Sequence, residues 1–219
     1  MSEASATLVA HRAAQFDDAA QQRESSVLGM WLFIATEVLF FGVLFAGYTF
    51  SRVRFPQAFA DGGARTDLLL GSIETGILLL SSCLAALAVR DVRFGACRAA
   101  GRLLWGTAML GVAFLVLHGV EYHAEYGEAL VPGIRYHPSG HPQPAMMIFF
   151  CLYYAITGFH SLHVAIGVAL LSRMAREASR GAFSADYFAP VEVTALYWHL
   201  VDIVWIFVYP LVYLVGRST

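Results

Sequence analysis

The residues of this sequence that could do chemistry are ionisable side chains set within apolar stretches. They are Glu37, Glu74, His118, His160, His163, Glu192, His199 and Asp202. A charged group in the hydrocarbon of a membrane is costly, so such a residue usually faces a neighbouring helix or a cavity and often marks a functional site. Carboxylate and imidazole groups can bind transition metals, relay protons or hydrogen-bond between helices. The residue types alone leave these three chemistries open.

The spacing of these residues places several of them on common helix faces. One series lies within residues 145–171 at steps of three or four: Tyr153, Thr157, His160, His163 and Gly167. A second series lies within residues 191–215 at steps of seven and three: Glu192, His199 and Asp202. We therefore expect these series to form a buried polar core between helices.

Two sharper interpretations compete with that structural one. The histidines and carboxylates could form a metal or haem site, but His160 and His163 are three residues apart and do not match the HExxH zinc pattern, whose histidines are four apart. Glu37 could carry protons, or it could be a neutral side chain that donates a structural hydrogen bond. The spacing favours the structural alternative over a metal site, and the physics of a buried glutamate favours it for Glu37.

The elements that must position these side chains are transmembrane helices. The chain is 58% hydrophobic and 14% charged, with a mean hydropathy of +0.61, whereas soluble domains are about 45–50% apolar and about 25% charged. A membrane helix needs roughly 20 mostly apolar residues. Five stretches satisfy this requirement: about 27–50, 68–89, 103–122, 145–171 and 191–215. The predicted fold class is all-α, an integral membrane bundle of five transmembrane helices over residues 27–219, preceded by a polar N-terminal tail over residues 1–26.

The distribution of arginine predicts the orientation of the bundle. The chain has no lysine, and its net charge of −2 gives no sign of a nucleic-acid partner. With the N-terminus in the cytoplasm, nine arginines fall on the inner side and five on the outer side, which agrees with the positive-inside rule. Cys83, Cys97 and Cys151 are scattered and form no CxxC motif, so neither a disulfide framework nor a cysteine metal site is expected.

Four segments resemble one known family, in the family's order along the chain. Residues 29–42, GMWLFIATEVLFFG, look like the glutamate-bearing helix of subunit III of the haem-copper terminal oxidases. Residues 157–164, TGFHSLHV, resemble that family's TGFHxxHV helix, and residues 197–205, YWHLVDIVW, are similar to its last helix. The pair Glu121-Tyr122 matches the family's EY. The match is to the five-helix form of the family and covers the chain from residue 27 onward.

The resemblance implies a non-catalytic subunit of a proton-pumping cytochrome c or quinol oxidase, which reduces oxygen to water in aerobic respiration. By this resemblance, haem and copper lie in the catalytic subunit I, and this chain binds structural phospholipids but no metal or other cofactor. It would support proton uptake and the stability of the catalytic subunit. The other oxidase subunits and a respiratory supercomplex are expected partners, and the expected location is the inner membrane of a bacterium, with the N-terminus in the cytoplasm and the C-terminus outside. The candidates for the lipid cleft are Trp31, Glu37, Tyr153, Tyr154 and His160.

The sequence departs from the family pattern at several positions. Glu74 stands where many relatives have asparagine, and His118 stands where they often have glutamine. Tyr187 and Phe188 replace the basic or histidine residues that often precede the last helix. These departures affect lipid and partner contacts rather than the fold.

Three alternative functions follow from the same residues. The chain could be the equivalent accessory subunit of a nitric oxide reductase. It could instead be an independent membrane metal or haem protein that uses His118, His160, His163 and His199. A free-standing proton or ion carrier is the third alternative. Whether cytochrome c or quinol donates electrons to such an oxidase is determined by its other subunits.

Overall fold

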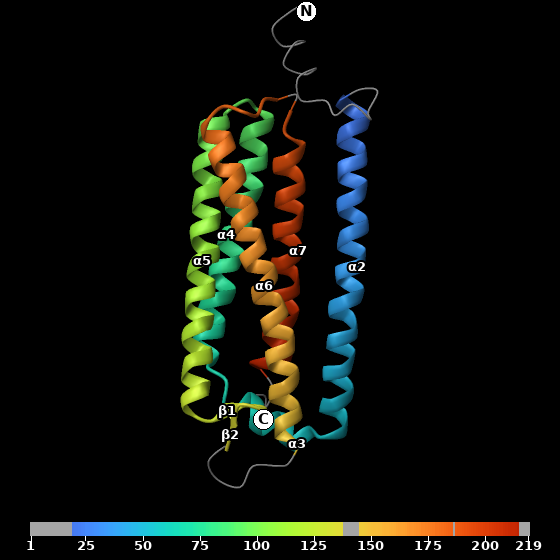
Figure 1. Cartoon of the computed structure of the whole chain (residues 1–219), viewed down its shortest axis with the longest axis vertical. Helices are drawn as coiled ribbons and strands as arrows, with labels where there is room; N and C mark the ends of the chain where they lie inside the picture. Colours follow the sequence, from blue (N-terminus) through green and yellow to red (C-terminus); the bar gives the residue numbers. More distant parts are fainter. Residues whose placement is uncertain (1–18, 138–144, 186, 215–219) are drawn as a thin grey trace, which may run out of the picture.

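Figure 1 shows the computed structural model, which describes residues 19–137, 145–185 and 187–214. The helices in these ranges are α2 (Ala19–Arg54), α3 (Pro56–Gly63), α4 (Leu68–Arg93), α5 (Cys97–Gly127), α6 (Met146–Ser179) and α7 (Ala189–Val212). A short antiparallel hairpin of β1 (Leu130–Val131) and β2 (Arg135–Tyr136) follows α5. All the described helices except α3 are long and apolar enough to cross a membrane, five in total. The predicted all-α membrane bundle is confirmed.

Four of the five long helices are longer than the apolar stretches that predicted them, whereas α7 ends at Val212, before the expected end at residue 215. Residues 1–18 of the predicted tail lie outside the described residues, but residues 19–26 already belong to α2. Helix α5 runs on to Gly127, five residues past the expected end of its span. Hydropathy detects only the part of a helix at hydrocarbon depth, whereas the backbone hydrogen bonds continue into the interface. The extension of α5 matters because it adds Glu125 to the helix that carries His118 and Glu121.

Local signals fix where the helices begin and end. The side chain of Asp67 caps α4, and its Oδ1 accepts hydrogen bonds from the backbone N–H groups of Leu69 and Leu70 at 2.9 and 3.1 Å. Helix α3 begins with Pro56 at its first turn, where no N–H is needed. Gly95 follows α4 with a φ of +78°, a left-handed conformation that glycine adopts readily.

Four of the helices form a mutually packed group, and α2 stands at its side (Figure 1). Helix α4 packs on α5 and α7, and α6 packs on α5 and α7. Helix α2 contacts α6 and α7, and it connects to the group through α3. In the apolar 18-residue segment of α2, 6% of the residues are buried within the chain, whereas 56% are buried in the corresponding segment of α7. Helix α7 is therefore the centre of the bundle, and α2 leaves most of its apolar surface to lipid or to another protein.

The indole of Trp198 on α7 lies against α5 and α6 at two glycines. Gly111 of α5 lies against it, since a Cβ atom there would come within 2.7 Å of the Trp198 ring and 2.6 Å of the Val168 side chain. A Cβ atom at Gly167 of α6 would also lie 2.7 Å from the Trp198 ring. The missing side chains thus allow α5 and α6 to close around Trp198, as small residues do between membrane helices.

Candidate functional site

Glu37 and His163 form an ion-pair contact between α2 and α6. The Nε2 atom of His163 lies 3.2 Å from Oε2 of Glu37, and the side chains are 15% and 16% exposed. The other ring nitrogen, Nδ1, lies 2.7 Å from the backbone carbonyl oxygen of Phe159. A carbonyl oxygen can only accept a hydrogen bond, so Nδ1 carries a proton and donates it.

The character of the contact between His163 and Glu37 depends on a second proton. With Nδ1 protonated, the contact between His163 Nε2 and Glu37 Oε2 is a hydrogen bond only if one of these two atoms carries a proton. The contact joins α2 to α6 through two side chains that are mostly shielded from solvent.

Aromatic side chains surround the pair. The rings of Phe41 and Tyr197 lie with their centroids 5.4 and 6.5 Å from that of His163. The hydroxyl group of Tyr197 on α7 donates to the backbone carbonyl of His163 at 3.0 Å. Phe33 of α2 stacks on Tyr197. The polar contact and its aromatic surroundings thus fasten α2 to both α6 and α7.

A second polar group lies inside the four-helix group, away from α2. Glu74 of α4 and the α5 residues His118 and Glu121 come together there, with side chains at most 3% exposed. The Nδ1 atom of His118 lies 3.5 Å from Glu74 Oε1 and 3.3 Å from Glu121 Oε2. Tyr213 donates its hydroxyl hydrogen to Glu121 Oε2 at 2.7 Å.

The polar network continues along α5 toward α6. Tyr154 donates to Glu125 Oε2 at 2.7 Å. The hydroxyl groups of Tyr122 and Thr157 lie 2.5 Å apart and share a hydrogen bond. These contacts bind α5 to α6 with polar side chains that are otherwise costly in an apolar bundle.

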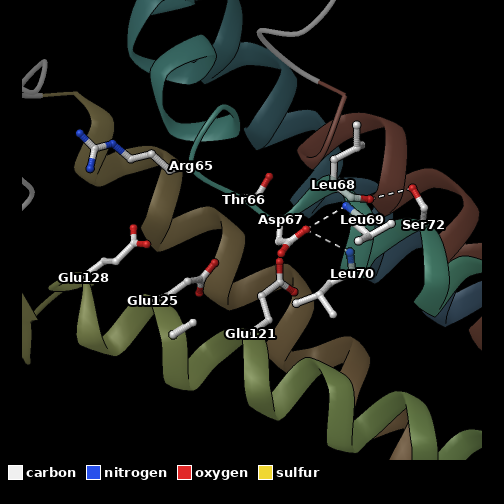
Figure 2. A pocket seen from close by; sticks show the side chains of 11 residues that line it. Arg65, Thr66, Asp67, Leu68, Leu69, Leu70, Ser72, Glu121, Glu125 and Glu128 are labelled. Atoms are coloured by element: carbon white, nitrogen blue, oxygen red, sulfur yellow. Dashed lines mark hydrogen bonds between the residues drawn. The ribbon is translucent and has the colours of Figure 1, made fainter.

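A pocket of about 650 Å³ opens between the beginning of α4 and the end of α5. Figure 2 shows Asp67 and Glu121 pointing into it, with Glu125 and Glu128 along the same wall as Glu121. Arg65 also lines the pocket (Figure 2). The pocket therefore has a mostly acidic polar lining, and through Glu121 it reaches the buried group of Glu74 and His118.

A seam of hydrogen bonds joins α4 to α7. The hydroxyl group of Ser82 lies 2.7 Å from Nδ1 of His199. The indole N–H of Trp198 donates to Ser81 Oγ at 2.9 Å, and that of Trp205 donates to Thr75 Oγ1 at 3.1 Å. Two indole–hydroxyl hydrogen bonds and one hydroxyl–imidazole hydrogen bond thus join α4 to α7.

Asp202 and His160 are buried without a hydrogen-bond partner among the described residues. Both carboxylate oxygens of Asp202 and both ring nitrogens of His160 are unpaired there. His160 is packed among rings instead, with centroids 4.9 Å from Trp205 and 5.6 Å from Phe114. The His160 face of α6 therefore points into the four-helix group, whereas His163 points to α2.

Glu192 lies at the end of the bundle rather than in its core. Its carboxylate accepts hydrogen bonds from Arg23 of α2 and from Arg93 at the end of α4. The two guanidinium groups also lie over the ring of Phe188. Both arginine side chains are nearly half exposed, so this is an interfacial ion-pair network joining three helices.

The five residues expected in a lipid cleft do not come together. Tyr153 and His160 are fully buried, and Tyr154 is turned to Glu125 on α5. Trp31 is 56% exposed on α2, where it lines a separate hollow with Arg23 and neighbouring residues. Trp31 is therefore exposed, Glu37 and Tyr154 are partly buried, and Tyr153 and His160 lie in the interior.

Sequence reasoning left out Glu121, Glu125 and Tyr213 from the polar core. Glu121 and Glu125 follow His118 at steps of three and seven, so their common face was readable from spacing alone. Glu121 lies in the last turn of the predicted span 103–122 and Glu125 lies beyond it, so hydropathy gives no reason to place either in the core. The contact of Tyr213 with Glu121 joins residues 92 positions apart and has no local signal.

The fold and the site define a class of protein, a membrane helical bundle whose ionisable side chains mainly make contacts between helices. The family model described as cytochrome c oxidase subunit III matches residues 11–217. This chain belongs to that family, as its four motifs indicated.

Curated relatives agree with this assignment. The chain is 31% identical over 202 residues to the cytochrome c oxidase subunit 3 of Thermostichus vulcanus, with 92% of each chain covered. It is 31% identical over 201 residues to the cytochrome bo(3) ubiquinol oxidase subunit 3 of Pseudomonas aeruginosa, covering 91% of this chain and 90% of the relative. It is 27% identical over 199 residues to the quinol oxidase subunit 3 of Bacillus subtilis, with 87% of each covered. Relatives named for cytochrome c and for ubiquinol are equally similar, so the level of identity favours neither electron donor.

Proposed function

We propose that this chain is a non-catalytic subunit of a haem-copper terminal oxidase, in which it covers one flank of the catalytic subunit and holds lipid there. The haem and copper centres then belong to the partner, and this chain supplies no redox group. The observation that carries the proposal is the position of α2, a largely exposed helix that is fastened to the bundle at Glu37 and His163.

The exposed surface of α2 calls for an apolar cover. Its side chains Leu39, Val43 and Phe50 are 71%, 72% and 73% exposed. Such exposure suits contact with acyl chains or with another membrane protein. A lipid layer held between α2 and the catalytic subunit would exclude water and stray ions from that flank. The supply of protons to the catalytic subunit would then keep pace with the supply of electrons.

The proposed orientation follows the arginines at the helix ends. The beginning of α2, the end of α4 and the end of α6 lie at one end of the bundle (Figure 1). That end carries Arg23, Arg93 and Arg176, among others. We place it in the cytoplasm of a bacterium by the positive-inside rule, with the opposite end outside the inner membrane.

Within this function we assign Glu37 the role of fastening α2 rather than of delivering protons. The variant Glu37→Gln can still donate a hydrogen bond to His163 Nε2 but cannot release a proton. The variant Glu37→Ala loses both abilities. If Glu37 only fastens α2 to the bundle, Glu37→Gln should preserve oxidase activity and Glu37→Ala should not.

The test compares oxidase complexes that contain the wild-type chain, Glu37→Gln, Glu37→Ala or no chain. Glu24→Gln, an exposed change on the same helix, is the control. Oxygen consumption and proton pumping are followed over many turnovers. We expect complexes without the chain and with Glu37→Ala to lose activity progressively, while Glu37→Gln and the control persist. Undiminished turnover and pumping without the chain would refute the shielding role, and loss of pumping in Glu37→Gln would refute the docking role.

A further inference from the structure

Glu74, His118 and Glu121 converge on one point between α4 and α5. One ligand atom from each lies within 4.8 Å of the other two. All three side chains are at most 3% exposed, so the group lies in the interior of the bundle rather than on its surface. A mixed set of one imidazole and two carboxylates is a donor set used by divalent transition metals.

The distances in this group are unsuited to hydrogen bonds. His118 Nδ1 lies 3.5 Å from Glu74 Oε1 and 3.3 Å from Glu121 Oε2, whereas N–H···O bonds are usually about 2.9–3.0 Å long. Moreover, a single Nδ1–H cannot serve two carboxylates equally. Ligand atoms bound at about 2.0–2.1 Å to one tetrahedral ion lie about 3.3 Å from each other. The two distances from Nδ1 are compatible with ligands that share an ion.

The group also leaves polar atoms without partners. Both oxygens of Glu74, both ring nitrogens of His118 and Oε1 of Glu121 make no hydrogen bond to any described residue. A buried carboxylate without a partner is strongly unfavourable. Glu121 has one partner, because its Oε2 accepts a hydrogen bond from Tyr213, and an ion of charge +2 would compensate the two carboxylates around this imidazole.

The surroundings supply outer support for such an ion. Tyr213 donates to Oε2 of Glu121 at 2.7 Å and fixes the direction of that carboxylate. The rings of Phe114, Tyr122 and Trp205 lie against the imidazole, with centroids 4.5 to 5.7 Å away. Hydrogen bonds to ligating carboxylates and a dry apolar shell are the usual outer environment of protein metal sites.

An entry path leads to the group from the end of the bundle. Glu121 lines the pocket between α4 and α5 and is also a member of the buried group. Asp67, Glu125 and Glu128 line the same pocket, with Arg65 as the one basic side chain among its lining residues (Figure 2). A predominantly acidic mouth raises the local concentration of cations.

We propose that Glu74, His118 and Glu121 bind one divalent transition-metal ion of the Zn²⁺ class, which enters through this pocket and clamps α4 to α5. The site is structural, because its ligands are buried and its pocket leads to no other group of reactive side chains among the described residues. It goes beyond the oxidase-subunit function and does not depend on it. The family resemblance implied no metal on this chain, and no spacing rule joins Glu74 to His118, which is 44 residues away.

The test uses the full-length chain purified in detergent, stripped with a chelator and titrated with Co²⁺. Visible d–d absorption reports coordination by nitrogen and oxygen, and Zn²⁺ competition gives the affinity. We expect one Co²⁺ per chain, displaced by one Zn²⁺. Loss of an outer-shell partner weakens metal binding about 10–100-fold, so loss of a ligand in Glu74→Gln or His118→Gln should weaken it by about 100-fold or more.

Two further variants make the result independent of folding defects. His199→Gln makes the same change at a histidine outside the group and should bind Co²⁺ like the wild type. Tyr213→Phe keeps the packing but removes the hydrogen bond to Glu121, and it should weaken binding about 10–100-fold. Helicity and elution volume confirm that each variant is folded. The absence of a saturable Co²⁺ spectrum, or an affinity unchanged in Glu74→Gln, His118→Gln and Tyr213→Phe, would overturn the proposal.

Discussion

Replacing Gly111 by alanine should separate the helices that close around Trp198. The added Cβ atom would lie 2.6 Å from Val168 Cγ2 and 2.7 Å from the Trp198 ring, whereas carbon atoms in contact are about 3.5–4.0 Å apart. An overlap of about 1 Å on two sides must be relieved by movement. Trp198 is fully buried and bonded to Ser81, so its ring has no open space to enter.

The size of the effect follows from comparison with Gly119 on the same helix. A Cβ atom at Gly119 meets nothing within 4 Å, so Gly119→Ala gains only the helix preference of alanine, about 1 kcal/mol. Gly111→Ala has the same gain but adds an overpacking cost of about 1–3 kcal/mol. The two variants should therefore differ in stability by about 1–3 kcal/mol, which corresponds to about 2–12 °C in melting temperature for a chain of this size.

The assay is thermal denaturation of each variant in one detergent, followed by the fraction that elutes as folded protein. We expect Gly119→Ala to melt at or above the wild-type temperature and Gly111→Ala to melt below Gly119→Ala. Equal melting temperatures for the two variants would show that α5 and α6 do not close on Trp198 as described.

Three further changes can be measured in the same assay. Ser81→Ala leaves the buried indole N–H of Trp198 without its acceptor and should cost about 1–3 kcal/mol; a wild-type melting temperature would contradict the seam between α4 and α7. Asp67→Ala removes the cap of α4 and should cost about 0.5–2 kcal/mol, whereas the exposed Asp61→Ala should be near neutral. Arg23→Gln breaks a half-exposed ion pair and should cost less than about 1 kcal/mol, and a larger loss would place that pair in a more buried setting.

The fold was predictable because membrane helices are specified by local composition. Each apolar stretch found in the sequence falls on one of the long helices α2, α4, α5, α6 and α7. The ends of the helices were less predictable, since α5 continues to Gly127 through Glu121 and Glu125. Hydropathy falls at these glutamates, although the backbone hydrogen bonds of the helix do not end there.

The partners within the polar core were not predictable in the same way. A step of three placed His160 and His163 on one broad face, but the structure divides that face, with His163 directed to Glu37 and His160 packed on Trp205. A turn of about 100° per residue separates positions three apart by about 60°, which is enough to aim two side chains at different helices. Glu192 likewise shares the face of its helix but lies at the bundle end, where arginines are available.

The central claim is that this chain serves a redox partner without carrying out redox chemistry itself. The most direct measurement is gentle purification through a tag on this chain, followed by a haem spectrum and identification of the co-purified proteins. We predict stoichiometric haem together with the catalytic subunit of an oxygen-reducing oxidase, and a colourless chain once that subunit is removed. Recovery with a nitric oxide reductase, or a lone coloured chain that oxidises an electron donor unaided, would contradict the account.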